Sequence, residues 1–89
     1  MKKFRFRYKY HEGDKASDWR NLDGGYDHIR RNASAMLHDS SPANVEQLIS
    51  NLDKISIGQR HLSLLAPHSK MVDGFKEPHN DYVEYERTA

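Results

Sequence analysis

The sequence contains no cysteine, and this absence bears on both stability and compartment. A chain without cysteine has no disulfide framework, no thiolate nucleophile and no thiolate metal ligand. The composition fits a protein of a reducing compartment, so we expect a cytoplasmic location.

Long hydrophobic runs are also missing. No stretch approaches the roughly 20 apolar residues of a membrane span, and the basic N-terminus lacks the apolar segment of a signal peptide. Charge of one sign is not in excess either, since the 89 residues carry a net charge of +1. We expect a soluble protein with no membrane association and a single small domain over residues 1–89.

Catalytic and cofactor motifs are absent as well. The sequence has no GxSxG, SxxK, P-loop or GxGxxG pattern, and none of its six histidines has HxH or HxxxH spacing. A zinc site would have to be assembled from distant positions, and a small ribonuclease built from Lys, Arg, His and Tyr would need no linear motif. We therefore predict no enzymatic activity, no cofactor and no metal site.

Apolar residues are few. Val, Ile, Leu and Phe together make 17 of the 89 residues, slightly below the roughly 20% under which disorder becomes a concern. The high net charge that usually accompanies disorder is missing. We expect a folded chain with little stability in reserve, for which a homodimer or a protein partner would supply additional burial.

Residues 3–10 and 81–87 show the alternation of a β-strand, in which successive side chains point to opposite faces. In the first segment Phe4 and Phe6 alternate with basic residues, and in the second Val83 and Tyr85 alternate with acidic ones. Opposite charges on facing strands make favourable cross-strand pairs. We therefore predict an α+β fold in β-α-α-β order, with the N- and C-terminal strands paired, antiparallel if two helices lie between them, and their apolar residues in the core.

Two or three helices are expected to pack on this small sheet, at about 24–38, 42–57 and 59–66. The first continues an apolar stripe that begins at Trp19 and Leu22, which are expected to pack from a preceding turn. The second can be capped by Ser41 and begin at Pro42, both of which favour a helix start. One long helix over 42–66 is the alternative to separate helices at 42–57 and 59–66. Such a long helix would extend beyond so small a domain, and the overhang would favour a dimer. Residues 11–17 and 67–80 are predicted as loops, the second anchored through Met71, Val72 and Phe75.

The function expected from these features is binding to another protein. A thin core, an open sheet edge and many Arg and Tyr residues are typical of an inhibitor, adaptor or regulatory module of a bacterial or phage type. The predicted partner-binding residues are Arg5, Arg7, Arg30 and Arg31. The alternative is a nucleic-acid-binding regulator that uses the same basic patch. Strict alternation argues against it, because it puts the aromatic and basic residues of the first strand on opposite faces.

Overall fold

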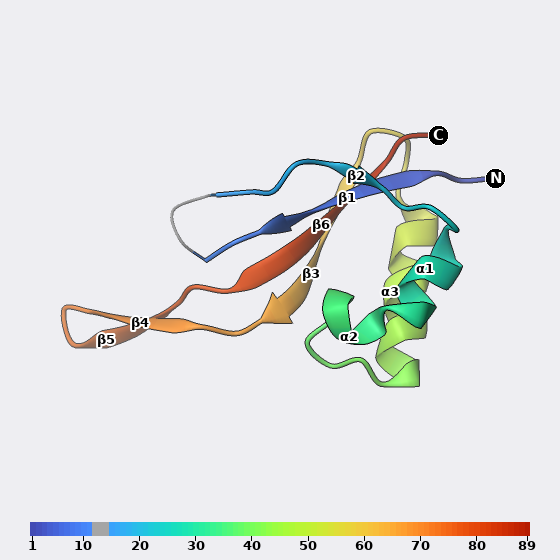
Figure 1. The fold of residues 1–89 in the computed structure, drawn as a ribbon. Helices are drawn as coiled ribbons and strands as arrows, with labels where there is room; N and C mark the ends of the chain where they lie inside the picture. Colours follow the sequence, from blue (N-terminus) through green and yellow to red (C-terminus); the bar gives the residue numbers. More distant parts are fainter. Residues whose placement is uncertain (12–14) are drawn as a thin grey trace.

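The computed structural model describes residues 1–11 and 15–89, which build a four-stranded sheet, a layer of helices and a projecting hairpin (Figure 1). The loop predicted for residues 11–17 includes residues 12–14, which lie outside this description. The described chain measures 48 × 26 × 19 Å. In order, the elements are β1 (Phe4–Lys9), β2 (Arg20–Asn21), α1 (Tyr26–Arg31), α2 (Ala33–Met36), α3 (Pro42–Lys54), β3 (Arg60–Ala66), β4 (Ser69–Val72), β5 (Phe75–Pro78) and β6 (Asp81–Arg87).

The pairing of the two terminal strands is confirmed. β1 and β6 are antiparallel neighbours, with Phe6 opposite Tyr85 and Arg7 opposite Glu84. The predicted sheet of two strands is too small, however, because β2 and β3 extend it to the order β2-β1-β6-β3. β6 is therefore an inner strand with partners on both sides, and the α+β class holds with a larger sheet than expected.

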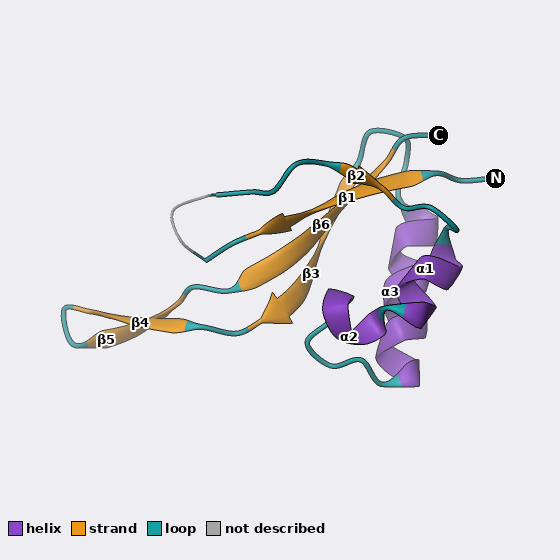
Figure 2. Ribbon diagram, in the orientation of Figure 1, coloured by secondary structure: helices purple, strands orange, loops and turns teal. Residues whose placement is uncertain are grey.

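The core lies between the sheet and the helices, all three of which cover the same face (Figure 2). Alternation in β1 and β6 turns Phe4, Phe6, Val83 and Tyr85 toward this layer, as predicted. Phe4 lies 5.7 Å from the ring of Tyr26 in α1. The helices contribute Ile29, Met36, Val45, Leu48, Ile49 and Leu52. No helix among residues 1–11 and 15–89 covers the opposite face of the sheet.

The helices differ in part from the prediction. The segment 24–38 forms two short helices, α1 and α2, separated at Asn32. The glycine pair delays the start, because Gly24 and Gly25 have φ values of 85° and 59°, outside the helical region. α3 begins at Pro42, as expected, and ends at Lys54, three residues before the predicted end. None of the helices in the described chain is long and apolar enough to cross a membrane.

The predicted helix at 59–66 is wrong, because this segment is strand β3. Gly58, with φ at 85°, turns the chain after α3, and β3 then pairs with β6, placing Leu62 opposite Glu84. This pairing satisfies the backbone of β3 through a distant segment, which no local period reveals. One long helix over 42–66 is excluded as well, and with it the overhang that favoured a dimer.

The predicted loop at 67–80 is also wrong over most of its length. Residues 69–78 form the β4–β5 hairpin, which projects from the body as an arm (Figure 1). Its turn has two positive φ values, 49° at Asp73 and 82° at Gly74, as in the tight turns that suit the twist of a hairpin. Met71 and Phe75 are 60% and 75% exposed, so they do not anchor this segment to the body.

Candidate functional site

The face of the sheet away from the helices, called the open face below, displays charged and aromatic side chains in three rows. Strand register defines the rows, because residues directly opposite one another point to the same side. The first row is Asn21, Arg5, Glu86 and Arg60; the second is Arg7, Glu84 and Leu62; the third is Lys9, Tyr82 and Leu64. Polar residues thus occupy one end of the open face, and apolar residues enter toward the other.

A network of ion pairs ties the first two rows together. Glu86 accepts hydrogen bonds from Arg5 and Arg60, each at 2.8 Å from Nε, and Glu84 accepts one from Arg7 at 2.8 Å. Lys9 lies 4.0 Å from Glu84. The hydrogen bond from Arg60, with that from Arg5, lowers the pKa of Glu86, and the same bond raises the pKa of Arg60. Glu86 and Arg60 are therefore both charged near neutral pH.

The cations of this network are more exposed than the carboxylates. The side chains of Arg5 and Arg60 are 35% and 48% exposed, whereas those of Glu84 and Glu86 are 7% and 13% exposed. The glutamates thus lie lower, and the guanidinium groups are presented to solvent above them. Four cationic side chains and two carboxylates share this part of the open face. The surface is consequently positive despite its internal ion pairs.

Trp19 lies among the arginines of the open face. Its ring centroid is 4.3 Å from Cζ of both Arg5 and Arg7 and 5.3 Å from Cζ of Arg60. Such distances are typical of cation–π contacts. Trp19 reaches this position because β2, which begins at the next residue, pairs with β1 and so brings Trp19 close to Arg7. The prediction that Trp19 begins the helical stripe is therefore wrong, whereas Leu22 is buried as expected.

The apolar end of the open face adjoins a pocket of about 310 Å³. Leu62 and Leu64 are 49% and 37% exposed there, although both are large apolar residues. Tyr82 is partly buried, and its hydroxyl oxygen accepts a hydrogen bond from Asn80 at 3.2 Å. The open face therefore joins a cationic region that contains one tryptophan to a smaller apolar region.

The structure does not bring the four predicted binding residues together. Arg5 and Arg7 belong to the open face, but Arg30 and Arg31 belong to α1, in the helical layer on the other side of the sheet. Arg30 is held by Glu46, at 2.8 Å, and by Asp27, at 3.1 Å. The sequence interpretation missed Arg60 and Trp19, because their place depends on β2 and β3, which it did not predict.

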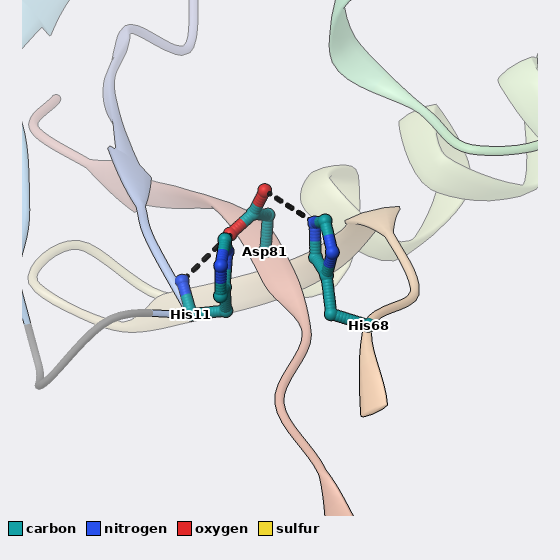
Figure 3. A group of neighbouring side chains, drawn as sticks. All are labelled: His11, His68 and Asp81. Carbon is teal, nitrogen blue, oxygen red and sulfur yellow. Dashed lines mark hydrogen bonds and ion pairs between the residues drawn. The ribbon is translucent and has the colours of Figure 1, made fainter. Parts of the chain in front are cut away.

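A second group of side chains, called the histidine cluster below, lies where the sheet meets the hairpin arm (Figure 3). It consists of His11, His68 and Asp81. Nδ1 of His11 is 2.8 Å from Oδ1 of Asp81, and Nε2 of His68 is 3.1 Å from Oδ2. The two imidazole rings stack with centroids 4.0 Å apart. No sequence motif indicates this cluster, because its residues come from three separate segments.

Burial alone would raise the pKa of Asp81, but hydrogen bonds from the ring and the backbone N–H of His11 and from His68 together lower it. The backbone N–H of His11 donates to Oδ1 at 2.6 Å. Asp81 is thus an ionised carboxylate that faces two imidazoles. In the described chain this is the one group of side chains with the residue types and spacing of a metal site.

The fold and the open face define a two-layer α+β domain whose uncovered sheet surface is cationic and aromatic. Comparison with known proteins adds no relative, since the chain matches no protein-family model, no curated protein and no solved structure. The functional argument therefore depends on the open face and the histidine cluster themselves.

Proposed function

We propose that the protein is a non-enzymatic binding module that recognises an acidic surface of a partner protein through its open face. The observation that carries this proposal is the arrangement of Trp19, Arg5, Arg7 and Arg60, in which three guanidinium groups surround one indole above two low-lying carboxylates. The ion pairs keep the guanidinium groups in place before any partner arrives. A preorganised surface loses less conformational entropy on binding than a mobile one.

The composition of the open face supports a protein as the partner. Trp, Tyr and Arg are the residues most enriched at interface hot spots, and all three occur here. Leu62 and Leu64 add exposed apolar area at one end, which suits the apolar centre of an interface. The excess of positive charge favours an acidic partner, because complementary potentials speed association and exclude wrong partners.

An inhibitor, adaptor or regulatory subunit of a bacterial or phage type is the kind of protein this proposal describes, acting in the cytoplasm. The proposal also includes a second copy of the chain as the protein partner. β3 is the last strand on its side of the described sheet, and two such strands can pair across a twofold axis. Light scattering distinguishes the two cases, because a homodimer has twice the 10.4 kDa mass of the chain.

A single-stranded nucleic acid is the second candidate partner. Alternation within β1 separates its own aromatic and basic residues, but Trp19 and Tyr82 come from other segments and lie on the basic side. A positive surface with aromatic residues supports contacts to phosphates and bases. Glu84 and Glu86 lie within the same surface and oppose phosphate binding, which is why a protein partner is favoured.

The test compares Arg60→Glu with Arg30→Glu in affinity capture from a nuclease-treated lysate of the source cells. The two arginines form a matched pair, since their side chains are 48% and 46% exposed and each pairs with a glutamate. Only Arg60 belongs to the open face. We expect wild type and Arg30→Glu to retain one stoichiometric partner and Arg60→Glu to lose it. Equal capture by the two variants would contradict the proposal.

Fluorescence of Trp19, the single tryptophan of the chain, provides the second readout. The purified partner should change the emission of wild type and of Arg30→Glu at matched concentrations. For the nucleic-acid alternative, a single-stranded oligonucleotide should change the emission instead, with an affinity that falls steeply as salt increases. An oligonucleotide response with no protein partner would replace the first proposal by the second.

A further inference from the structure

We propose that His11, His68 and Asp81 form a binding site for one divalent transition-metal ion of the Zn²⁺ type. This site is separate from the protein-binding role proposed for the open face. The three residues come from the segment just after β1, the link between β3 and β4, and the start of β6. Their candidate ligand atoms all lie within 4.8 Å of one another (Figure 3).

The spacing of the donor atoms is close to that of a metal site. Ligands about 2.0–2.2 Å from a tetrahedral ion are separated from one another by about 3.4 Å. Nδ1 of His11 and Nε2 of His68 lie 2.8 Å and 3.1 Å from the two oxygens of Asp81. Both contacts are a few tenths of an ångström shorter than this separation and involve different oxygens, while the whole set of ligand atoms lies within 4.8 Å, so an ion requires small rotations of these partly exposed side chains.

The protons of the cluster can be accounted for. Each ring can donate an N–H to the carboxylate, from Nδ1 of His11 and from Nε2 of His68. When the ion binds, those two nitrogens coordinate it through their lone pairs, and each ring carries its proton on the other nitrogen. The carboxylate remains ionised, so the loaded site has a net charge of +1.

The surroundings hold the carboxylate and leave room for an ion to enter. Asp81 is only 18% exposed, and the backbone N–H of His11 donates to it at 2.6 Å, a contact that fixes its orientation. His11 and His68 are 35% and 40% exposed, so solvent reaches both imidazole side chains. Water can then complete the coordination as the fourth ligand.

The donor set indicates the kind of ion. Two imidazole nitrogens and one carboxylate oxygen suit Zn²⁺, Co²⁺, Ni²⁺ and Cu²⁺, whereas Ca²⁺ and Mg²⁺ prefer oxygen ligands throughout. A bound ion would join β1, β6 and the base of the β4–β5 arm at one point. The expected role is therefore to fix the arm relative to the sheet.

The test uses untagged full-length protein stripped of metal with a chelator and titrated with Zn²⁺ in a calorimeter. We expect one ion per chain. His68→Phe, which keeps a ring against His11 but has no nitrogen, should weaken binding at least about tenfold, since even outer partners of metal ligands contribute that much. Asp81→Asn should weaken it similarly. The matched control is His38→Phe, because His38 is an exposed histidine outside the cluster, and its affinity should equal that of wild type.

A measurement on the wild-type protein keeps the proposal testable if a variant fails to fold. Imidazole resonances assigned by NMR should change for His11 and His68 when one equivalent of Zn²⁺ is added. The proposal is overturned if binding does not saturate at one ion per chain. It is equally overturned if His68→Phe binds as tightly as His38→Phe, or if the affected resonances belong to other histidines.

Discussion

Replacing Tyr85 by phenylalanine should stabilise the protein. The ring of Tyr85 is fully buried in the core, and its hydroxyl has no hydrogen-bond partner among the described residues. Burial also raises the pKa of this phenol, so the group stays neutral. A buried hydroxyl without a partner costs about 1–3 kcal/mol in lost hydration, whereas the void left by one oxygen costs at most about 1 kcal/mol. The net expectation for Tyr85→Phe is a gain of about 1 kcal/mol.

For a domain of this size, 1 kcal/mol corresponds to a rise in Tm of about 4–8 °C. Thermal unfolding followed by circular dichroism, with urea unfolding as a second probe, measures the change. Tyr82→Phe is the matched control on the same strand, because its hydroxyl faces the open side and accepts a hydrogen bond from Asn80. We expect no gain from the control. A Tm of Tyr85→Phe at or below that of wild type would refute the reasoning.

Three further substitutions test the core and the pH dependence of stability. Leu52→Ala should lose about 2–5 kcal/mol in urea unfolding because Leu52 is completely buried, whereas Leu62→Ala, half exposed on the open face, should lose less than about 1 kcal/mol. Burial lowers the pKa of His61, so its contribution to stability is complete above the unfolded pKa of about 6.5 and is lost as pH falls through the folded pKa. When the pH is lowered from 7.5 to 5, wild type should therefore lose more stability than His61→Gln. Equal changes of Tm in the two proteins would contradict this cause.

The strands β1 and β6 were predictable because each carries its own pattern. Alternation fixes which residues of a strand share a face, and the complementary charges of Arg7 and Glu84 indicate which strands pair. α3 was predictable for the same reason, since Val45 and Leu48 begin a helical stripe after Pro42. In these elements the local pattern and the tertiary environment agree.

β3 was missed because its local pattern fits two structures. Leu62, Leu65 and Ala66 continue the spacing of a helix, while Leu62 and Leu64 fit a strand equally well. Only the pairing with β6, about 20 residues further along the chain, decides between them. The β4–β5 hairpin differs, since Asp73-Gly74 is a local turn signal that could have predicted it. The turn signal did not lead to a hairpin prediction, because the segments on either side of it show no alternation of apolar and polar residues.

The candidate sites were less predictable than the fold. Trp19 lies at helical spacing before Tyr26, but its contacts are with arginines of two other segments. His11 and His68 are separated by 57 positions and meet only because Asp81 begins the strand that both segments flank. Neither grouping leaves a pattern in the sequence, because each depends on three segments that converge after folding.

One strand links the core, the open face and the histidine cluster. β6 turns Val83 and Tyr85 into the core and Glu84 and Glu86 toward the arginines, and it begins with Asp81. A slip of one residue would exchange these faces, so the ion pairs to β1 help to fix the register as well as to present the arginines. Substitution of Glu84 or Glu86 would therefore confound stability with binding. Arg60 and Trp19 lie outside β1 and β6, so variants at these two positions leave the ion pairs between β1 and β6 in place.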